Sequence, residues 1–327
     1  MPPSRERLGV WSAETGFRAE TLEKVVRLGE FLADVSRHPL LSRVLFLKGG
    51  TALNLGFGPP ARLSIDLDFN YVGAEDRKAM LAERPGVERA LEVVAAGSGY
   101  RLQRSSDEFG GRKLFLGYRN AFGTPDRTEV DVSYLHRVPL VEPAEVTLWQ
   151  PGEGAGPRVR MVGPAELFGG KICALLDRVA PRDLYDAARL PTLAGEAWGQ
   201  PSFRAVFLAL AGTLDHPVHT YREDRFGRVG DEEVRDQLHP MLARNDRPSA
   251  IQLRADAWSV VGPLLRLTDR EREFIDRLHQ GELQAELIAP GDEALAERIR
   301  RHPGLLWKVQ NARNHKVRRG ANRKGAE

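Results

Sequence analysis

The stretch Val44–Val72 decides how this chain is expected to fold, and it reads VLFLKGGTALNLGFGPPARLSIDLDFNYV. A short apolar run leads into Lys48-Gly49-Gly50-Thr51, and a helix-like segment and a Gly/Pro turn follow. From Ser64 to Tyr71 polar and apolar residues then alternate strictly, which is the period of a half-buried strand. The pattern predicts a strand, a turn into a helix, and a second strand.

The second strand places Asp66 and Asp68 on one face, about 7 Å apart at the ~3.3–3.4 Å rise of a strand. Two neighbouring carboxylates repel each other and lose hydration unless something compensates them. Mg²⁺ does so readily, because it prefers one or two carboxylates together with substrate phosphates. We therefore expect Asp66 and Asp68 to hold Mg²⁺, with Mn²⁺ as the alternative metal. The simpler interpretation is the solvated face of an edge strand.

The Gly49-Gly50 turn is suited to bind phosphate. Without Cβ atoms its N–H groups can approach an anion closely, and the N-terminus of the following helix carries partial positive charge. An ordinary strand-to-helix turn would leave the same pattern. The residues expected to bind the nucleotide and its phosphates are Lys48, Gly49, Gly50, Thr51, Arg62 and Ser64.

These motifs resemble the AbiEii-type nucleotidyltransferase toxins, a branch of the nucleotidyltransferase superfamily that includes the MenT-like toxins of toxin–antitoxin systems. The resemblance covers roughly residues 20–190. It is carried by LKGGTAL (47–53), by RLSIDLDF (62–69) and by a later Lys171 followed by RDLYD (182–186).

The resemblance implies an α+β fold, in which a nucleotidyltransferase-like mixed or antiparallel sheet is flanked by helices and followed by a mostly helical domain. It also implies transfer of a nucleotide from a nucleoside triphosphate to an acceptor hydroxyl of RNA, at the tRNA 3′ end, with a cognate antitoxin as partner. Its catalytic residues match Asp66, Asp68, Lys171 and Asp183 here, with Asp186 as a further candidate.

A third carboxylate is expected from the strand predicted at Thr128–Leu135. Glu129, Asp131 and Ser133 alternate there with apolar residues. If this strand lies beside the one that carries Asp66 and Asp68, Asp131 joins them on the same face. Strand register cannot be read from sequence, so a surface strand with polar outer positions is the alternative.

Lys171 and the acids after it lie on two predicted helices. Lys171 falls within the apolar stripe of the first helix, so it is expected to reach a cleft, where it would neutralise triphosphate charge; snorkelling to solvent is the alternative. Asp183 lies in the first turn of the next helix, where an acid also interacts well with the dipole. It would orient Lys171 or accept a proton from the attacking hydroxyl.

The composition is that of an ordinary globular protein of 327 residues, with 42% hydrophobic and 28% charged residues. No apolar segment follows the first residues, and the longest uncharged apolar run, Ala205–Leu214, is too short to span a bilayer. A cytoplasmic protein without a membrane partner is expected. The single Cys173 excludes internal disulfides. The expected domains are 1–190 (nucleotidyltransferase), 191–310 (helical, acceptor-binding) and 311–327 (a disordered basic tail).

The basic character of the chain comes from its end. The net charge is +3, but residues 311–327 hold six Lys/Arg and one acid, a net +5, which leaves about −2 for the remainder. Such a tail either solubilises the protein or anchors RNA electrostatically.

Two other functions fit the same residues. One is a catalytically inactive regulator that binds nucleotide or RNA, and the other is a nucleotidyltransferase that modifies a protein or a small molecule. A further hypothesis concerns Ser64, which is expected on the strand face of the aspartates. Its phosphorylation would add about −1.5 to −2 of charge and compete with the triphosphate.

Overall fold

The computed structural model describes residues 3–105 and 110–324, which belong to two compact units. The first unit lies within residues 1–137, 142–163 and 231–249. The second lies within residues 138–141, 164–230 and 250–327.

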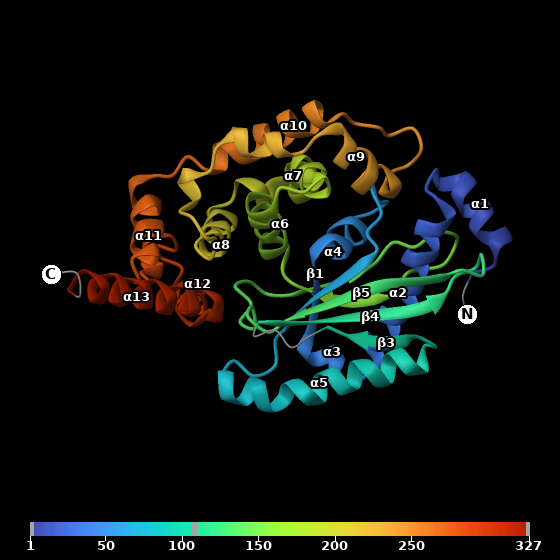
Figure 1. Cartoon of the computed structure of the whole chain (residues 1–327), viewed down its shortest axis with the longest axis horizontal. Coiled ribbons are helices and arrows are strands. Elements are labelled where there is room, and N and C mark those ends of the chain that lie inside the picture. Colours follow the sequence, from blue (N-terminus) through green and yellow to red (C-terminus); the bar gives the residue numbers. More distant parts are fainter. Residues whose placement is uncertain (1–2, 106–109, 325–327) are drawn as a thin grey trace. The chain divides into compact units, whose positions relative to one another are not determined.

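A seven-stranded mixed sheet forms the centre of the first unit, with the strand order β3-β4-β5-β2-β1-β7-β6 (Figure 1). The pairs β2–β5 and β1–β7 are parallel, and the other neighbours are antiparallel. This sheet and its flanking helices confirm the predicted α+β fold. The strands are β1 (Leu45–Lys48), β2 (Asp66–Tyr71), β3 (Arg101–Arg104), β4 (Gly111–Arg119), β5 (Pro125–Ser133), β6 (Ala144–Thr147) and β7 (Arg158–Met161).

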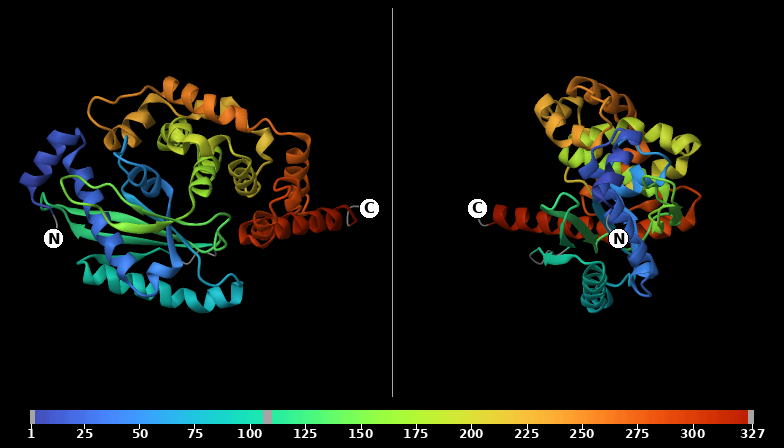
Figure 2. Two further views of the ribbon diagram at one scale, coloured as in Figure 1. Left: turned by 180° about the vertical axis from the view of Figure 1, so that it is seen from behind. Right: turned by 90° about the vertical axis from the view of Figure 1, so that its right-hand side faces the viewer.

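The apolar half of the alternating β2 sequence forms the core of this unit. Leu67, Phe69 and Tyr71 are at most 2% exposed, and α2 packs across the sheet next to β7 (Figure 2). Burial of these residues on one face leaves the opposite face of β2 for its carboxylates. The helices of the first unit are α1 (Arg5–Thr15), α2 (Ala19–Arg37), α3 (Leu41–Val44), α4 (Gly49–Gly56), α5 (Arg77–Gly97) and α9 (Asp231–Gln237), followed by the 3₁₀ turn η4 (His239–Met241).

The sequence between Ser12 and His38 has an apolar stripe that predicts one helix, but the structure has two helices there, α1 and α2. Gly16 ends α1 with a left-handed backbone (φ 75°), and its N–H donates to the Ser12 carbonyl. Since a residue without Cβ adopts this conformation at no steric cost, Gly16 is a natural helix end. The apolar stripe that suggested one helix belongs to α2 alone.

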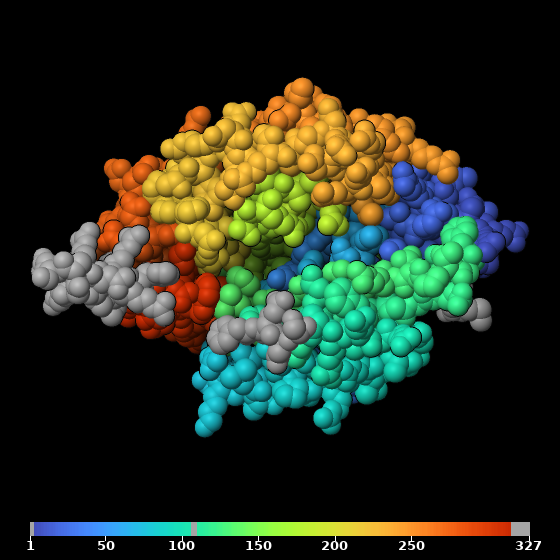
Figure 3. All heavy atoms as spheres, viewed as in Figure 1, coloured from blue at the N-terminus to red at the C-terminus, as the bar shows by residue number. Residues whose placement is uncertain are grey.

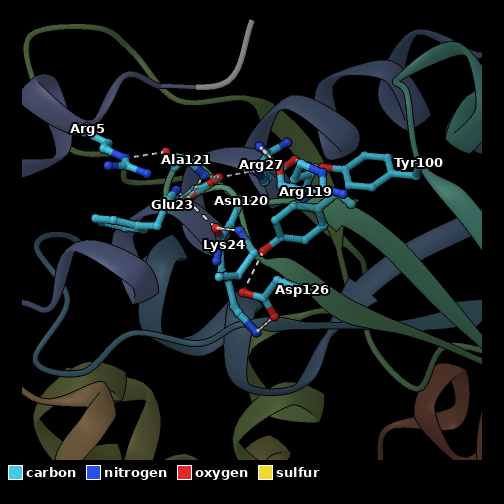
Figure 4. Close-up of polar contacts among 12 residues, drawn as sticks. Arg5, Glu23, Lys24, Arg27, Tyr100, Arg119, Asn120, Ala121 and Asp126 are labelled. Atoms are coloured by element: carbon cyan, nitrogen blue, oxygen red, sulfur yellow. Dashed lines mark hydrogen bonds and ion pairs between the residues drawn. The ribbon is translucent and has the colours of Figure 1, made fainter.

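A buried polar network ties α2 to the β4–β5 turn (Figure 4). Glu23 is 1% exposed, accepts from the backbone N–H of Ala121 at 2.9 Å and pairs with Arg27 at 2.8 Å. Arg27 also donates to the Arg119 carbonyl and lies 4.2 Å from the ring centroid of Tyr118. The charges are thus paired and hydrogen-bonded, as buried ions require.

Glu23→Ala is expected to destabilise the protein by about 3–5 kcal/mol, because it leaves the Arg27 guanidinium buried without its carboxylate. The matched control is Lys24→Ala on the same helix, which breaks the more exposed Lys24–Asp126 pair and should cost only about 1 kcal/mol. Urea unfolding measures both free energies. Equal losses in the two variants would contradict the assignment of Glu23 as a structural ion.

The second unit contains only helices and loops in its described residues. Four helices form its centre: α6 packs on both α7 and α8, and α7 also packs on α10. Its helices are α6 (Pro164–Arg178), α7 (Pro181–Ala194), α8 (Pro201–Ala211), α10 (Ala250–Leu264), α11 (Asp269–His279), α12 (Glu293–Arg301) and α13 (Pro303–Lys324); its 3₁₀ turns are η1 (Gly195–Gly199), η2 (Val218–Thr220), η3 (Glu223–Arg228) and η5 (Ala285–Leu287).

The boundaries between the units differ from the predicted 1–190, 191–310 and 311–327. Helices α6 and α7 belong to the helical unit, because they pack on each other and on α8 and α10. Residues 231–249 return to the first unit, where Met241 accepts a backbone hydrogen bond from Leu63 and Leu242 forms a bridge with Arg62. Of the tail expected to be disordered, residues 311–324 belong to helix α13, and 325–327 lie outside the described residues.

Candidate active site

The Gly-Gly turn and the carboxylate strand meet directly in the first unit. Lys48 at the end of β1 lies opposite Asp68 of β2 in the antiparallel register. Gly49 follows with φ 72°, and a Cβ atom on it would lie 2.1 Å from the Asp68 Oδ2 atom. Only glycine permits this approach of turn and carboxylate. The turn and the aspartate face therefore meet at Asp68.

Asp131 lies on the neighbouring strand at the matching level. The parallel β2–β5 register places Asp68 opposite Asp131 and Asp66 opposite Glu129. The predicted condition for a third carboxylate on this face is met. Asp66, Asp68 and Asp131 are all half-buried. Three acids on adjacent strands beside a glycine turn form an oxygen-rich, negatively charged surface.

A lysine on this face was not singled out from the sequence. Lys113 of β4 lies opposite Asp131 and pairs with Glu129 at 3.3 Å. Burial opposes the charge of Lys113, but the hydrogen bond to Glu129 and the charges of Glu129, Asp131 and Asp66 together raise its pKa. The sequence around Lys113 does not indicate this role, because its two acidic neighbours, Glu129 and Asp131, lie on another strand.

Three expected phosphate-binding residues are buried in the protein. Thr51 is fully buried and its hydroxyl donates to the Asp66 carbonyl at 2.6 Å, so it fixes α4 to the start of β2 instead of facing a phosphate. Arg62 is 2% exposed and donates to the Leu63 carbonyl. Ser64 is 5% exposed and precedes β2, so the expectation that it lies on the strand face is wrong. Its burial also argues against phosphorylation of the folded protein.

Arg62 and Ser64 nonetheless lie directly under the turn. A Cβ on Gly50 would come within 2.6 Å of the Ser64 hydroxyl oxygen and 3.2 Å of an Arg62 guanidinium nitrogen. The two side chains therefore pack against the turn, and Arg62 adds positive charge next to it.

Gly49→Ala is expected to lower activity by at least about 100-fold, because its Cβ must displace the Asp68 carboxylate, and misplacement by about 1 Å costs that much. The left-handed backbone adds about 1–2 kcal/mol of strain. Gly58→Ala is the matched control, since Gly58 has φ 96° but open space around the added Cβ. It should lose similar stability and keep its activity. Equal activities in the two variants would refute the role of the close approach.

The second unit holds the other predicted site residues as one buried ionic cluster. Lys171 of α6 is 6% exposed, and its ammonium lies 2.8 Å from Asp186 and 3.7 Å from Asp183, both of α7. Lys171 does not snorkel to solvent, so that alternative is wrong. The two helices present one cation to two carboxylates.

Asp183 has a second cationic partner in Arg178, which the sequence did not reveal. Arg178 binds both of its carboxylate oxygens, at 2.6 and 2.9 Å. Burial alone would raise the pKa of Asp183, but the Arg178 hydrogen bond and the charges of Lys171 and Arg178 lower it below its usual value. Asp183 is thus a poor proton acceptor, and its geometry suits the positioning of Lys171 instead.

The turn between α6 and α7, next to this cluster, contains a residue with a strained backbone. Val179, which follows Arg178, has φ 53°, and in the described part of the chain no other non-glycine residue has a positive φ. A β-branched residue rarely adopts this region, and such strain often occurs at functional sites. Val179 is 5% exposed, so its packing helps to maintain the turn.

The face that carries Asp66, Asp68 and Asp131 suits Mg²⁺, which takes few protein ligands, better than it suits a metal ion that is bound only by protein side chains. Within residues 3–105 and 110–324, no group of three or more His, Cys, Asp or Glu side chains is arranged to hold a metal ion. Mg²⁺ needs no such cage, since one or two carboxylates and substrate phosphates suffice. Asp66 and Asp68 supply hard oxygen ligands beside a turn where a Cβ is excluded.

The candidate site thus consists of a glycine turn packed against Asp68, with Asp66 on the same strand and Asp131 on the next. The family model described as "Nucleotidyl transferase AbiEii toxin, Type IV TA system" matches residues 30–258, which is more than half of the chain. The chain belongs to this AbiEii family, so it is a nucleotidyltransferase of a toxin–antitoxin family. Membership implies an antitoxin partner.

Two solved structures are similar to this chain. MenT4, a nucleotidyltransferase toxin from Mycobacterium tuberculosis H37Rv, superposes with a TM-score of 0.62 at 17% identity, over 89% of this chain and 98% of that chain. JHP933 from Helicobacter pylori gives a TM-score of 0.45 at 17% identity, over 76% and 94% of the two chains. No curated protein matches the sequence. In the described residues, no helix is both long and apolar enough to cross a membrane.

Proposed function

We propose that this protein transfers a nucleotide from a nucleoside triphosphate to an acceptor hydroxyl of RNA, at the 3′ end of tRNA, in a Mg²⁺-dependent reaction that a cognate antitoxin restrains. The observation that carries the proposal is the contact between the Gly49 turn and Asp68, with Asp131 at the same level on the next strand. A phosphate held by the turn would lie beside the metal-binding carboxylates.

The first unit would bind the reacting phosphates. The N–H groups of Gly49 and Gly50, at the N-terminus of α4, donate to phosphate oxygens, and Lys48 and the buried Arg62 add positive charge. Asp66 and Asp68 would hold Mg²⁺, which supplies Lewis-acid activation of the α-phosphorus and stabilises negative charge on the leaving group. Mn²⁺ offers the same ligand preference.

The acceptor hydroxyl attacks the α-phosphorus, its oxygen forms the new P–O bond, and the α–β phosphoanhydride bond breaks to release pyrophosphate. The hydroxyl proton needs an acceptor, and a carboxylate can serve as one. Asp131 is half-buried on the same face as Asp66 and Asp68, whereas Asp183 is bound by Arg178 and its pKa is lowered. We therefore assign proton acceptance to Asp131 and the positioning of Lys171 to Asp183 and Asp186. Lys171 would offset triphosphate charge.

A labelling assay tests this proposal. The full chain is incubated with each α-labelled nucleoside triphosphate, Mg²⁺ and total RNA, with parallel reactions that contain EDTA, Mn²⁺ or purified tRNA. We expect one triphosphate to be consumed, the label to appear in RNA, and EDTA to abolish the signal. Label in protein or in a small molecule would assign a different acceptor. No incorporation with any triphosphate, under conditions that support a known nucleotidyltransferase, would favour the inactive regulator.

A further inference from the structure

Two adjoining hollows form a groove on the surface of the second unit. One, of about 430 Å³, is lined by the segment from His216 to Arg228, and the other, of about 400 Å³, adds the end of α10 and the residues after it, to Arg266. They share Tyr221 and Arg222, so they adjoin at these two residues, and together they are called the groove below. Figure 3 shows the yellow segment before α9 and the orange α10 side by side on the molecular surface.

The groove carries a concentrated positive charge. Its lining contains one acid, Asp224, and four arginines, so its net charge is +3 with His216 neutral; the arginines are Arg222, Arg225, Arg228 and Arg266. Three of them, Arg222, Arg228 and Arg266, have exposed side chains. Arg225 is fixed, because its guanidinium donates to the Leu176 and Asp177 carbonyls at the end of α6 and lies 5.1 Å from the centroid of the Tyr221 ring.

An aromatic floor lies beside these charges. Trp258 of α10 is half-buried, packs edge-to-face on Phe226 with centroids 5.7 Å apart, and lies so close to Gly262 that a Cβ there would come within 3.1 Å of its ring. Pro263 and Leu265 complete an apolar wall. The indole is therefore held rigidly, as a stacking platform requires.

We propose that this groove binds single-stranded RNA, with phosphates on its arginines and an unstacked base on Trp258. Single strands are recognised by this combination of a basic groove and aromatic platforms. An acidic peptide would use the arginines but would have no need of an apolar, Trp258-lined hollow beside them. The proposal rests on the proposed function only in identifying the bound RNA as the nucleotide acceptor.

The test is binding of a short labelled single-stranded RNA to the full chain, measured by fluorescence anisotropy over a salt series without triphosphate or Mg²⁺. Arg228→Gln/Arg266→Gln should reduce the slope of log affinity against log salt by about 1.4, since each lost phosphate contact on a single strand contributes about 0.7. Trp258→Ala should weaken binding about tenfold, and Trp258→Phe should restore most of it.

The control is Arg235→Gln/Arg272→Gln, which removes the same total charge from two exposed arginines outside the groove. It should leave the slope unchanged, and urea unfolding should show all variants folded. An equal slope change in both arginine pairs, or wild-type binding by Trp258→Ala, would overturn the proposal. A polyglutamate peptide that binds through the same arginines without dependence on Trp258 would identify an acidic protein partner instead.

This experiment also separates the groove from the enzymatic proposal. Because it needs neither triphosphate nor metal, RNA binding through the groove can be established even when no transfer is detected. If Arg228→Gln/Arg266→Gln changes neither RNA binding nor nucleotide transfer to RNA, the enzyme assignment stands. The proposal that the groove binds RNA is then wrong.

Discussion

Asp66→Asn and Asp68→Asn are each expected to reduce nucleotide transfer by about 10³-fold or more while the protein stays folded. An amide of the same size keeps the packing of β2 but removes the charge that would hold Mg²⁺ against the triphosphate. Metal stabilisation of a phosphoryl transition state is worth several kcal/mol, and each 1.36 kcal/mol is about tenfold in rate. Single-turnover transfer with labelled triphosphate measures the loss.

The matched control is Glu145→Gln on β6, which removes one carboxylate from the same sheet where it only pairs with exposed Arg158 and Arg160. It should retain activity within a few-fold. Asp131→Asn belongs in the same series: it should lower the rate most at low pH, if its carboxylate accepts the proton. Full activity in both Asp66→Asn and Asp68→Asn would eliminate the carboxylate pair as the metal site.

Lys171→Met is expected to destabilise the protein by about 3–5 kcal/mol and to abolish transfer. The ammonium lies 2.8 Å from Asp186, which is 1% exposed, so its removal leaves a carboxylate in the interior of the second unit without that cation. Urea unfolding measures the stability, and transfer is assayed well below the unfolding midpoint.

The double variant Lys171→Met/Asp186→Leu separates structure from chemistry. Replacing both partners of a buried ion pair by apolar residues is often neutral for stability, so it should recover most of the lost free energy of unfolding. If Lys171 acts on the triphosphate, the double variant still fails to transfer nucleotide. Recovery of activity together with stability would show that Lys171 is purely structural.

The sequence predicted the carboxylate pair and the glycine turn correctly because both are local patterns. Alternation with period two places Asp66 and Asp68 on one strand face wherever that strand lies, and a Gly-Gly after an apolar run marks a tight turn into a helix. The sequence also separated Lys171 and Asp183 onto consecutive helices, since their apolar stripes are local too.

Burial and strand register were decided by tertiary structure alone. Thr51 and Ser64 look like donors in the sequence, but the contact of α4 with β2 buries both and uses the Thr51 hydroxyl on the Asp66 carbonyl. Asp131 reaches the level of Asp68 only through a parallel pairing across about sixty residues of chain. A shift of one residue would have turned it to the other face.

The sequence by itself therefore determined the fold class and the identity of the acids on β2, because side-chain alternation and turn chemistry act between neighbours in the chain. Only the tertiary structure decided that Lys171 is enclosed by Asp183 and Asp186, that Arg178 binds Asp183, and that Arg228 and Trp258 line one groove. These relations join segments distant in sequence, and their geometry is set by the packing of whole helices and strands.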